Sequence, residues 1–302
     1  MRRTSGKSLA MFIAAMVLWG TIGLFRRAIP LSSGLVACAR GIIGALFLAL
    51  LTRARGRRLF HGIGWRKTLL LALAGAVMGI NWILLFEAYR FTSVSVATLC
   101  YYMEPTFLIL ASPLLLRERL TTRKALCAAA SLLGMALVSG ILDSAPPQAG
   151  EWRGILLGLG AAVLYTGVVL LNKRTAGVDP YEKSVLQLTA AAGILLPYLL
   201  LTEDFTALSL TGEALGMLLV IGILHTGIAY ALYFGSLDGL RAQTIAIFSY
   251  IDPVTALVLS ALLLSERLSG AAILGALLIL ASAITSELEP PPSNKQQPSK
   301  RT

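Results

Sequence analysis

The sequence predicts an all-α integral membrane protein with ten transmembrane helices in two inverted five-helix repeats. Three observations predict this class. The composition is 56% hydrophobic and only 14% charged over 302 residues, with a mean hydropathy of +0.77, which leaves too little polar surface for a water-soluble globule of this size. Apolar runs long enough to span a bilayer recur along the chain. One long segment also occurs twice, about half a chain apart.

The apolar runs define the expected helices. Each is about 17–25 residues long, which as a helix spans a bilayer core, and they cover 9–28, 34–52, 68–88, 93–116, 123–142, 154–172, 184–201, 214–234, 243–264 and 270–286. The first run follows MRRTSGKS and resembles a secretory signal. It exceeds the usual apolar core of a signal, however, and ends at Phe25-Arg26-Arg27 with no small-residue cleavage pattern. We therefore expect it to remain as the first helix.

The repeat is clearest in the fourth and ninth runs. Residues 102–120 read YMEPTFLILASPLLLRERL and residues 250–268 read YIDPVTALVLSALLLSERL. The pairs Glu104-Pro105 and Asp252-Pro253 are therefore 148 positions apart. Each pair puts an acid and a proline in the middle of an apolar run, and the glutamates of the two ERL endings are expected to act as caps or ion pairs at helix ends.

Shorter matches extend the repeat over most of the chain. At offsets of 146 to 148, Trp19 corresponds to Tyr165, Arg40 to Gln187, and Trp82 to Tyr230. We therefore place one five-helix repeat at 9–142 and the second at 154–286, joined by the turn-forming residues 143–150. Residues 287–302 are rich in Pro, Gln and Lys and are predicted to form a disordered cytoplasmic tail.

The distribution of basic residues predicts the orientation of the two halves. With the N-terminus in the cytoplasm, 20 Lys and Arg residues fall on the cytoplasmic side and five on the other, namely Arg26, Arg27, Arg90, Arg153 and Arg267. This bias predicts a multi-pass protein of the inner or plasma membrane with both termini cytoplasmic. Five helices is an odd number, so the second half enters from the opposite side. Such inverted repeats are typical of alternating-access transporters.

Particular residues link the sequence to a family. The chain resembles the EamA-type transporters of the drug/metabolite transporter superfamily in Trp19-Gly20, in Arg40, in the doubled acid-proline and LLLxERL endings, and in Gly134. The resemblance covers nearly the whole chain. It implies ten helices in two inverted repeats, transport of small metabolites, and a central cavity lined by the first, third, fourth, sixth, eighth and ninth helices.

The acid-proline pairs are the first candidates for function. Helix rise places Glu104 about 18 Å into its span, and Asp252 lies near the middle of its own. A carboxyl at this depth is costly and is by default a functional hypothesis, and burial favours its protonated form, which suits proton coupling. Pro105 and Pro253 remove backbone donors, which should break the helices and free the carbonyls of Tyr101 and Ser249. A kinked, purely structural acid is the alternative.

Aromatic side chains are the second group of candidates. Trp19, Trp82, Tyr165 and Tyr230 lie within spans, and Tyr101 shares the helix face of Glu104. Together with Ser249 they are expected to line the cavity, where aromatic rings attract an amine by about 0.5–2 kcal/mol each. Packing in the membrane core is the alternative for any one of them.

Three ionisable residues carry separate expectations. Arg40 lies too deep in its helix to be a free surface charge, and Glu87 is at comparable depth, so a structural ion pair is favoured over contact of Arg40 with a solute carboxylate. His225 is expected to be a hydrogen-bonded core residue, with a proton relay to Asp252 as the alternative.

The favoured function is secondary active transport of small organic metabolites, such as amino acids or amines, with export and proton coupling as refinements. The alternatives are a uniporter or channel-like facilitator and a membrane-embedded enzyme. The sequence contains no nucleotide-binding or hydrolase signature that would support an enzyme.

No metal or cofactor is predicted, since the three cysteines fall within expected spans. The basic residues flank helices without interleaved aromatics, which argues against nucleic acid. The expected partners are a small-molecule solute and the lipid bilayer, as a monomer or homodimer.

Overall fold

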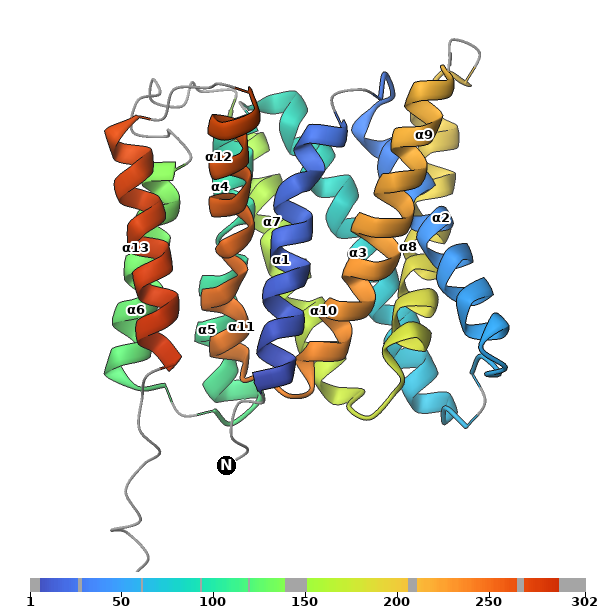
Figure 1. The fold of residues 1–302 in the computed structure, drawn as a ribbon, viewed down its shortest axis with the longest axis horizontal. Helices are drawn as coiled ribbons and strands as arrows, with labels where there is room; N and C mark the ends of the chain where they lie inside the picture. Colours follow the sequence, from blue (N-terminus) through green and yellow to red (C-terminus); the bar gives the residue numbers. More distant parts are fainter. Residues whose placement is uncertain are drawn as a thin grey trace, which may run out of the picture.

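The computed structural model describes residues 6–26, 29–60, 62–92, 94–118, 120–138, 151–205, 211–264 and 269–287. Within these ranges the chain is helical and contains no β-strand, as predicted. The helices stand side by side in a single bundle (Figure 1). The end at which α1 begins is called the N-terminal end. The expected linker at 143–150 and the tail beyond residue 287 lie outside the described residues.

The helices of the first half follow the predicted runs. They are α1 (Gly6–Arg26), α2 (Ser33–Ala54), α3 (Trp65–Phe91), α4 (Val94–Tyr101), α5 (Glu104–Leu115) and α6 (Thr122–Val138). The Ser32 hydroxyl accepts the Leu35 N–H at 3.2 Å and caps the start of α2. The fourth run forms two short helices, because Pro105 has no N–H to continue the ladder from α4.

The second half has a similar order of elements. It comprises α7 (Trp152–Arg174), α8 (Pro180–Thr202), α9 (Gly212–Val220), the π-helix η3 (Ile221–Ile228), α10 (Ala229–Leu237), α11 (Ala242–Ser249), α12 (Ile251–Leu264) and α13 (Gly270–Glu287). Asp179 caps α8 by accepting the Tyr181 N–H at 2.9 Å. The ninth run is divided into α11 and α12 just before Asp252-Pro253, as the fourth is before Glu104-Pro105.

Seven helical segments of the described chain are long and apolar enough to cross a membrane. The other three expected spans are shorter here: the fourth is broken into α4 and α5, and α6 and α13 have 17 and 18 residues. Large apolar side chains point away from the bundle, among them Leu114 and Leu201, which are 83% and 87% exposed. An apolar surface of this kind suits contact with lipid.

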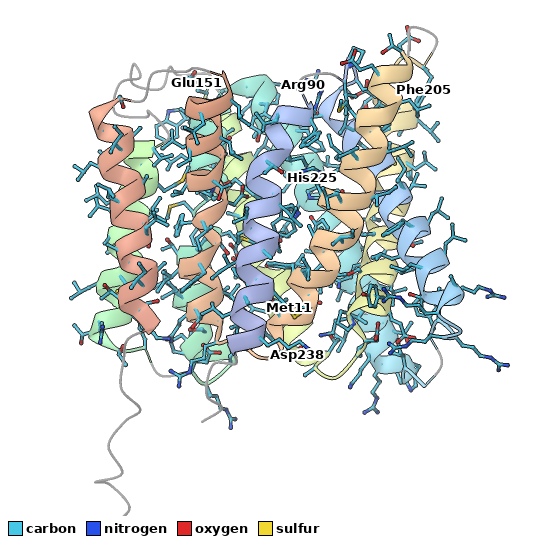
Figure 2. The ribbon with its side chains drawn as sticks, in the orientation of Figure 1. Met11, Arg90, Glu151, Phe205, His225 and Asp238 are labelled. Carbon is cyan, nitrogen blue, oxygen red and sulfur yellow. The ribbon has the colours of Figure 1, made fainter. Side chains whose placement is uncertain are left out.

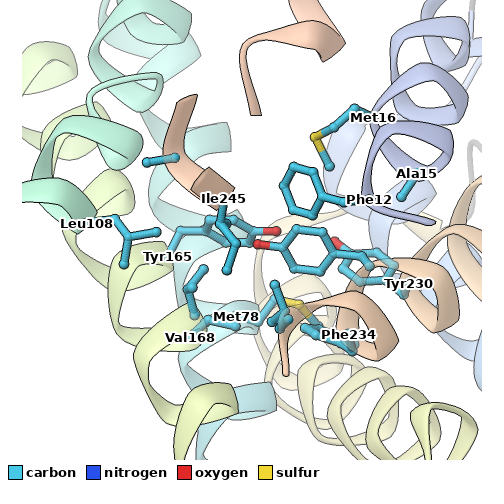
Figure 3. Close-up of a cluster of buried hydrophobic side chains, with 14 of the residues drawn as sticks. Phe12, Ala15, Met16, Met78, Leu108, Tyr165, Val168, Tyr230, Phe234 and Ile245 are labelled. Carbon is cyan, nitrogen blue, oxygen red and sulfur yellow. The ribbon is translucent and has the colours of Figure 1, made fainter. Parts of the chain in front are cut away.

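Part of the main core lies in the half of the bundle nearer the N-terminus. Figure 3 shows part of it, with Phe12 of α1, Met78 of α3, Val168 of α7 and Ile245 of α11, all fully buried. Phe12 also packs against Tyr233 of α10, with ring centroids 5.4 Å apart. These side chains close the bundle on that side, and we call them the plug.

Small residues bring α6 and α13 into close contact. A Cβ built on Gly134 would lie 2.6 Å from the Gly275 carbonyl oxygen, and one on Gly275 would lie 2.5 Å from that of Gly134. Backbones can approach this closely only because both positions lack a side chain. The last helix of each half is therefore packed closely against that of the other half.

Candidate functional site

A cavity of about 630 Å³ lies between helices of both halves. Its walls come from α1, α2, α3, α4, α7, α10, α11 and α12, together with the first residue of α5. The lining residues include all eight that the sequence predicted, Trp19, Trp82, Tyr101, Glu104, Tyr165, Tyr230, Ser249 and Asp252, and also Arg40. The repeat thus brings residues more than 200 positions apart to one site.

The cavity occupies the half of the bundle away from the N-terminus. On α1 it is lined by residues 16–23 of a helix that starts at residue 6, and on α2 by Arg40, near the start of a helix that runs the opposite way. Two of its lining residues, Gly23 of α1 and Ala256 of α12, are exposed. Figure 2 shows the two ends: Asp238 and Met11 lie toward the N-terminal end, and Arg90, Glu151 and Phe205 at the other. The plug separates the cavity from the N-terminal end.

Aromatic rings cover much of the cavity wall. Trp19 lies 4.9 Å from Tyr230 and 5.0 Å from Tyr233 between ring centroids, and Tyr101 lies 6.0 Å from Tyr165. These separations are typical of favourable edge and tilted ring contacts. The rings pack against one another, and all of them line the cavity, where aromatic rings can attract a positively charged group.

Trp19 is fixed from behind by His225 of the π-helix. The Trp19 indole donates its N–H to the His225 carbonyl oxygen at 2.9 Å, and Thr21 Oγ1 lies 2.7 Å from His225 Nε2. The His225 ring is fully buried and packs against Phe25 at 4.9 Å. The described contacts of His225 are therefore those of a hydrogen-bonded core residue that positions Trp19, and they do not include Asp252.

The two carboxyls of the acid-proline pairs differ in their surroundings. Glu104 is 5% exposed, and its Oε1 has no hydrogen-bond partner among the described residues. Asp252 is half-buried and accepts a hydrogen bond from the Tyr102 hydroxyl at 3.3 Å. The predicted helix breaks are present, since α4 ends at Tyr101 and α11 ends at Ser249. Both acids therefore stand at the start of a new helix, where the positive end of the helix dipole favours a carboxylate.

The expected ion pair between Arg40 and Glu87 does not form. Arg40 lies over the Trp82 ring, with its guanidinium carbon 4.9 Å from the ring centroid. Glu87 instead accepts hydrogen bonds from Arg90, at 3.0 Å, and from the Tyr198 hydroxyl of α8. The prediction compared depth alone, whereas α3 turns Glu87 toward α8 and α2 turns Arg40 into the cavity. No carboxylate of the described chain lies within ion-pair distance of Arg40.

Some residues that line the cavity were not predicted from the sequence. Tyr102 and Tyr233 line the cavity, as does Gly20 of α1. A Cβ on Gly20 would lie 2.7 Å from the Asp252 carbonyl oxygen, so this glycine lets α1 approach α12 beside the acid. Tyr102 could have been found, because Tyr250 is its repeat counterpart at the same offset as the acids.

Glu118 of the first ERL ending acts at a helix end, as predicted. Both of its carboxylate oxygens accept the Ala242 N–H at 3.0 Å, where α11 begins. Lys173 donates to the nearby Leu240 carbonyl oxygen. Glu266, the corresponding residue of the second copy, lies outside the described residues.

Comparison with known proteins gives concordant matches. The sequence pattern of the EamA-like transporter family matches residues 6–140 and again residues 152–286. The uncharacterized transporter YxxF of Bacillus subtilis (strain 168) is 30% identical over 270 residues, covering 89% of this chain and 86% of the relative. Protein PecM of Dickeya dadantii (strain 3937) is 28% identical over 225 residues, covering 74% of each. A solved crystal structure has the same fold, with a TM-score of 0.83 over 95% of this chain and 99% of that chain at 21% identity.

Proposed function

Since this chain belongs to the EamA-like transporter family of the drug/metabolite transporter superfamily, we propose that it is a secondary transporter of amines or amino acids. The chain is a multi-pass membrane protein, and the proposal places it in the inner or plasma membrane with both termini in the cytoplasm. Ten spanning segments in two inverted halves would exchange conformations to move the solute by alternating access.

The observation that carries the proposal is the chemistry of the cavity. Glu104 and Asp252 supply negative charge or hydrogen-bond acceptors, and the rings around Trp19 and Tyr230 offer faces that attract cations. Arg40, which has no carboxylate partner in the described chain, faces the same space. A guanidinium binds a carboxylate well through paired N–H donors. An amine fits the first set of groups, and an amino acid fits both.

The position of the cavity supports an outward-facing state. The plug closes the bundle on the side of the N-terminus, and the cavity occupies the other half. With the N-terminus in the cytoplasm, the observed cavity faces outward. The opposite state would require the plug around Phe12 and Tyr233 to open and the helices around the cavity to close.

Ligand binding by the purified protein tests the proposed solute class. In a thermal-shift screen of amino acids, amines, nucleosides and organic acids, we expect amines or amino acids to raise the unfolding temperature. Binding to the folded state alone adds about 2.7 kcal/mol at a ligand concentration 100 times Kd. The shift should be reduced in Asp252→Asn and retained in Glu213→Gln, an exposed acid at the start of α9. Stabilisation by nucleosides or organic acids alone would contradict the proposal.

A further inference from the structure

Two tyrosines at matching positions of the repeat make unequal contacts. Tyr102 and Tyr250 each lie two residues before the acid of their own repeat, and their rings are 6.4 Å apart. The Tyr102 hydroxyl donates to Asp252, the acid of the other repeat, at 3.3 Å. The Tyr250 hydroxyl does not donate to Glu104 but to the backbone carbonyl oxygen of Tyr102, at 3.1 Å. The pair is therefore symmetric in sequence and asymmetric in hydrogen bonding.

Among the described residues, the asymmetry leaves Asp252 with a tyrosine donor and Glu104 without one. Asp252 has a tyrosine donor, whereas Glu104 Oε1 is buried with no hydrogen-bond partner among the described residues. A buried polar atom without a partner calls for an explanation. Tyr250 directly follows α11, and α11 packs against α5, which begins at Glu104. The Tyr250 hydroxyl is therefore a candidate donor for Glu104, but in this structure it donates to the Tyr102 carbonyl oxygen.

We propose that Tyr102 and Tyr250 form a switch in which each tyrosine holds the acid of the opposite repeat in only one of two states. In the observed state Tyr102 holds Asp252 and Glu104 is free. In the opposite-facing state Tyr250 holds Glu104, Tyr102 donates to the Tyr250 carbonyl oxygen, and Asp252 is free. The inference rests on the proposed function, because it requires the two inverted halves to exchange conformations. Each acid is then available to the solute on one side of the membrane only.

The switch predicts opposite effects for two otherwise similar substitutions. Once the acid has released its proton, a hydrogen bond to its carboxylate is about twice as strong as one to a neutral carbonyl. Tyr102→Phe loses the stronger bond in the observed state and the weaker one in the opposite state, so it favours the opposite state. Tyr250→Phe has the reverse effect. We expect each to shift the ratio of the two states by roughly fivefold, in opposite directions.

Thiol labelling in proteoliposomes measures this ratio. In a background without Cys38, Cys100 and Cys127, Ala256→Cys reports on the exposed wall of the observed cavity. Ala15→Cys reports on a fully buried position of α1, three residues after Phe12 of the plug. A membrane-impermeant maleimide added to one side or the other gives the two labelling rates. We expect Tyr102→Phe to slow labelling at Ala256→Cys and speed it at Ala15→Cys, and Tyr250→Phe to do the opposite.

The outcomes separate the switch from the transport proposal. Shifts in the same direction for the two tyrosine variants, or no shift in either, would overturn the switch, even if solute still changes the labelling of the wild-type reporters. Failure of solute to change either wild-type reporter would contradict alternating access itself. Asp252→Asn provides a second route to the same test if Tyr102→Phe does not fold. It keeps an acceptor for Tyr102 but removes the charge, so it should shift the ratio in the same direction as Tyr102→Phe.

Discussion

Proton-driven accumulation of solute is expected to be lost in Glu104→Gln, while exchange of solute across the membrane continues. Glutamine has nearly the shape of glutamate but cannot bind and release a proton at neutral pH. Glu104 lines the cavity, is 5% exposed and has a carboxyl oxygen without a partner in the described chain. If one proton moves with each solute, a gradient of one pH unit supports about tenfold accumulation. In the variant this ratio should fall to about one.

Uptake of labelled solute into proteoliposomes with an imposed pH gradient measures the effect. Glu213→Gln is the matched control, because Glu213 is an exposed acid on α9 outside the cavity. It should accumulate solute as the wild type does. The same dependence of accumulation on the pH gradient in wild type and Glu104→Gln would contradict the role of Glu104 in coupling.

A large loss of stability is expected for Asp238→Asn. The Lys183 side chain is 1% exposed, and its Nζ lies 2.9 Å from Asp238 Oδ1. Lys183 is in the first turn of α8, so this ion pair holds Asp238 next to the start of that helix. Removing the negative charge leaves a buried ammonium without its counter-charge, which typically costs 3–5 kcal/mol. Asp238 is itself 27% exposed, so we expect the free energy of unfolding to fall by about 3 kcal/mol, the lower end of that range.

The comparison variant is Asp179→Asn. Asp179 pairs with Arg57 at 3.2 Å, but the Arg57 side chain is 66% exposed, and exposed pairs contribute about 0–1 kcal/mol. Asparagine also caps a helix about as well as aspartate, so the start of α8 should be retained. Chemical or thermal unfolding in detergent gives both values. Equal losses in the two variants would show that burial of Lys183 does not determine the strength of its ion pair.

The position of the cavity could be predicted from the sequence because the repeat relates the two halves by symmetry. Glu104-Pro105 and Asp252-Pro253 lie at one offset, and an inverted repeat brings such pairs toward the same central axis. The helix breaks follow from proline chemistry alone. The structure agrees on both points, with breaks at Tyr101 and Ser249 and both acids lining one cavity.

The partners of individual side chains could not be predicted in the same way. Depth in the membrane matched Arg40 with Glu87, but the direction in which each helix faces decided their contacts, and this depends on how α2, α3 and α8 pack. The π-helix at Ile221–Ile228 also gave no signal in the sequence, although it carries the His225 carbonyl that holds Trp19. Local pattern therefore predicted eight of the cavity residues, and tertiary packing determined how they are held.

Counterflow in proteoliposomes tests most directly whether the central cavity carries solute by alternating access. Vesicles are loaded with an unlabelled amine or amino acid identified by the thermal-shift screen and diluted into a trace of the labelled solute. We predict transient accumulation of label that saturates with solute concentration and is strongly reduced in Asp252→Asn. A flux that rises linearly with concentration and far exceeds carrier turnover, as in a channel, or no accumulation of label at all, would contradict the account.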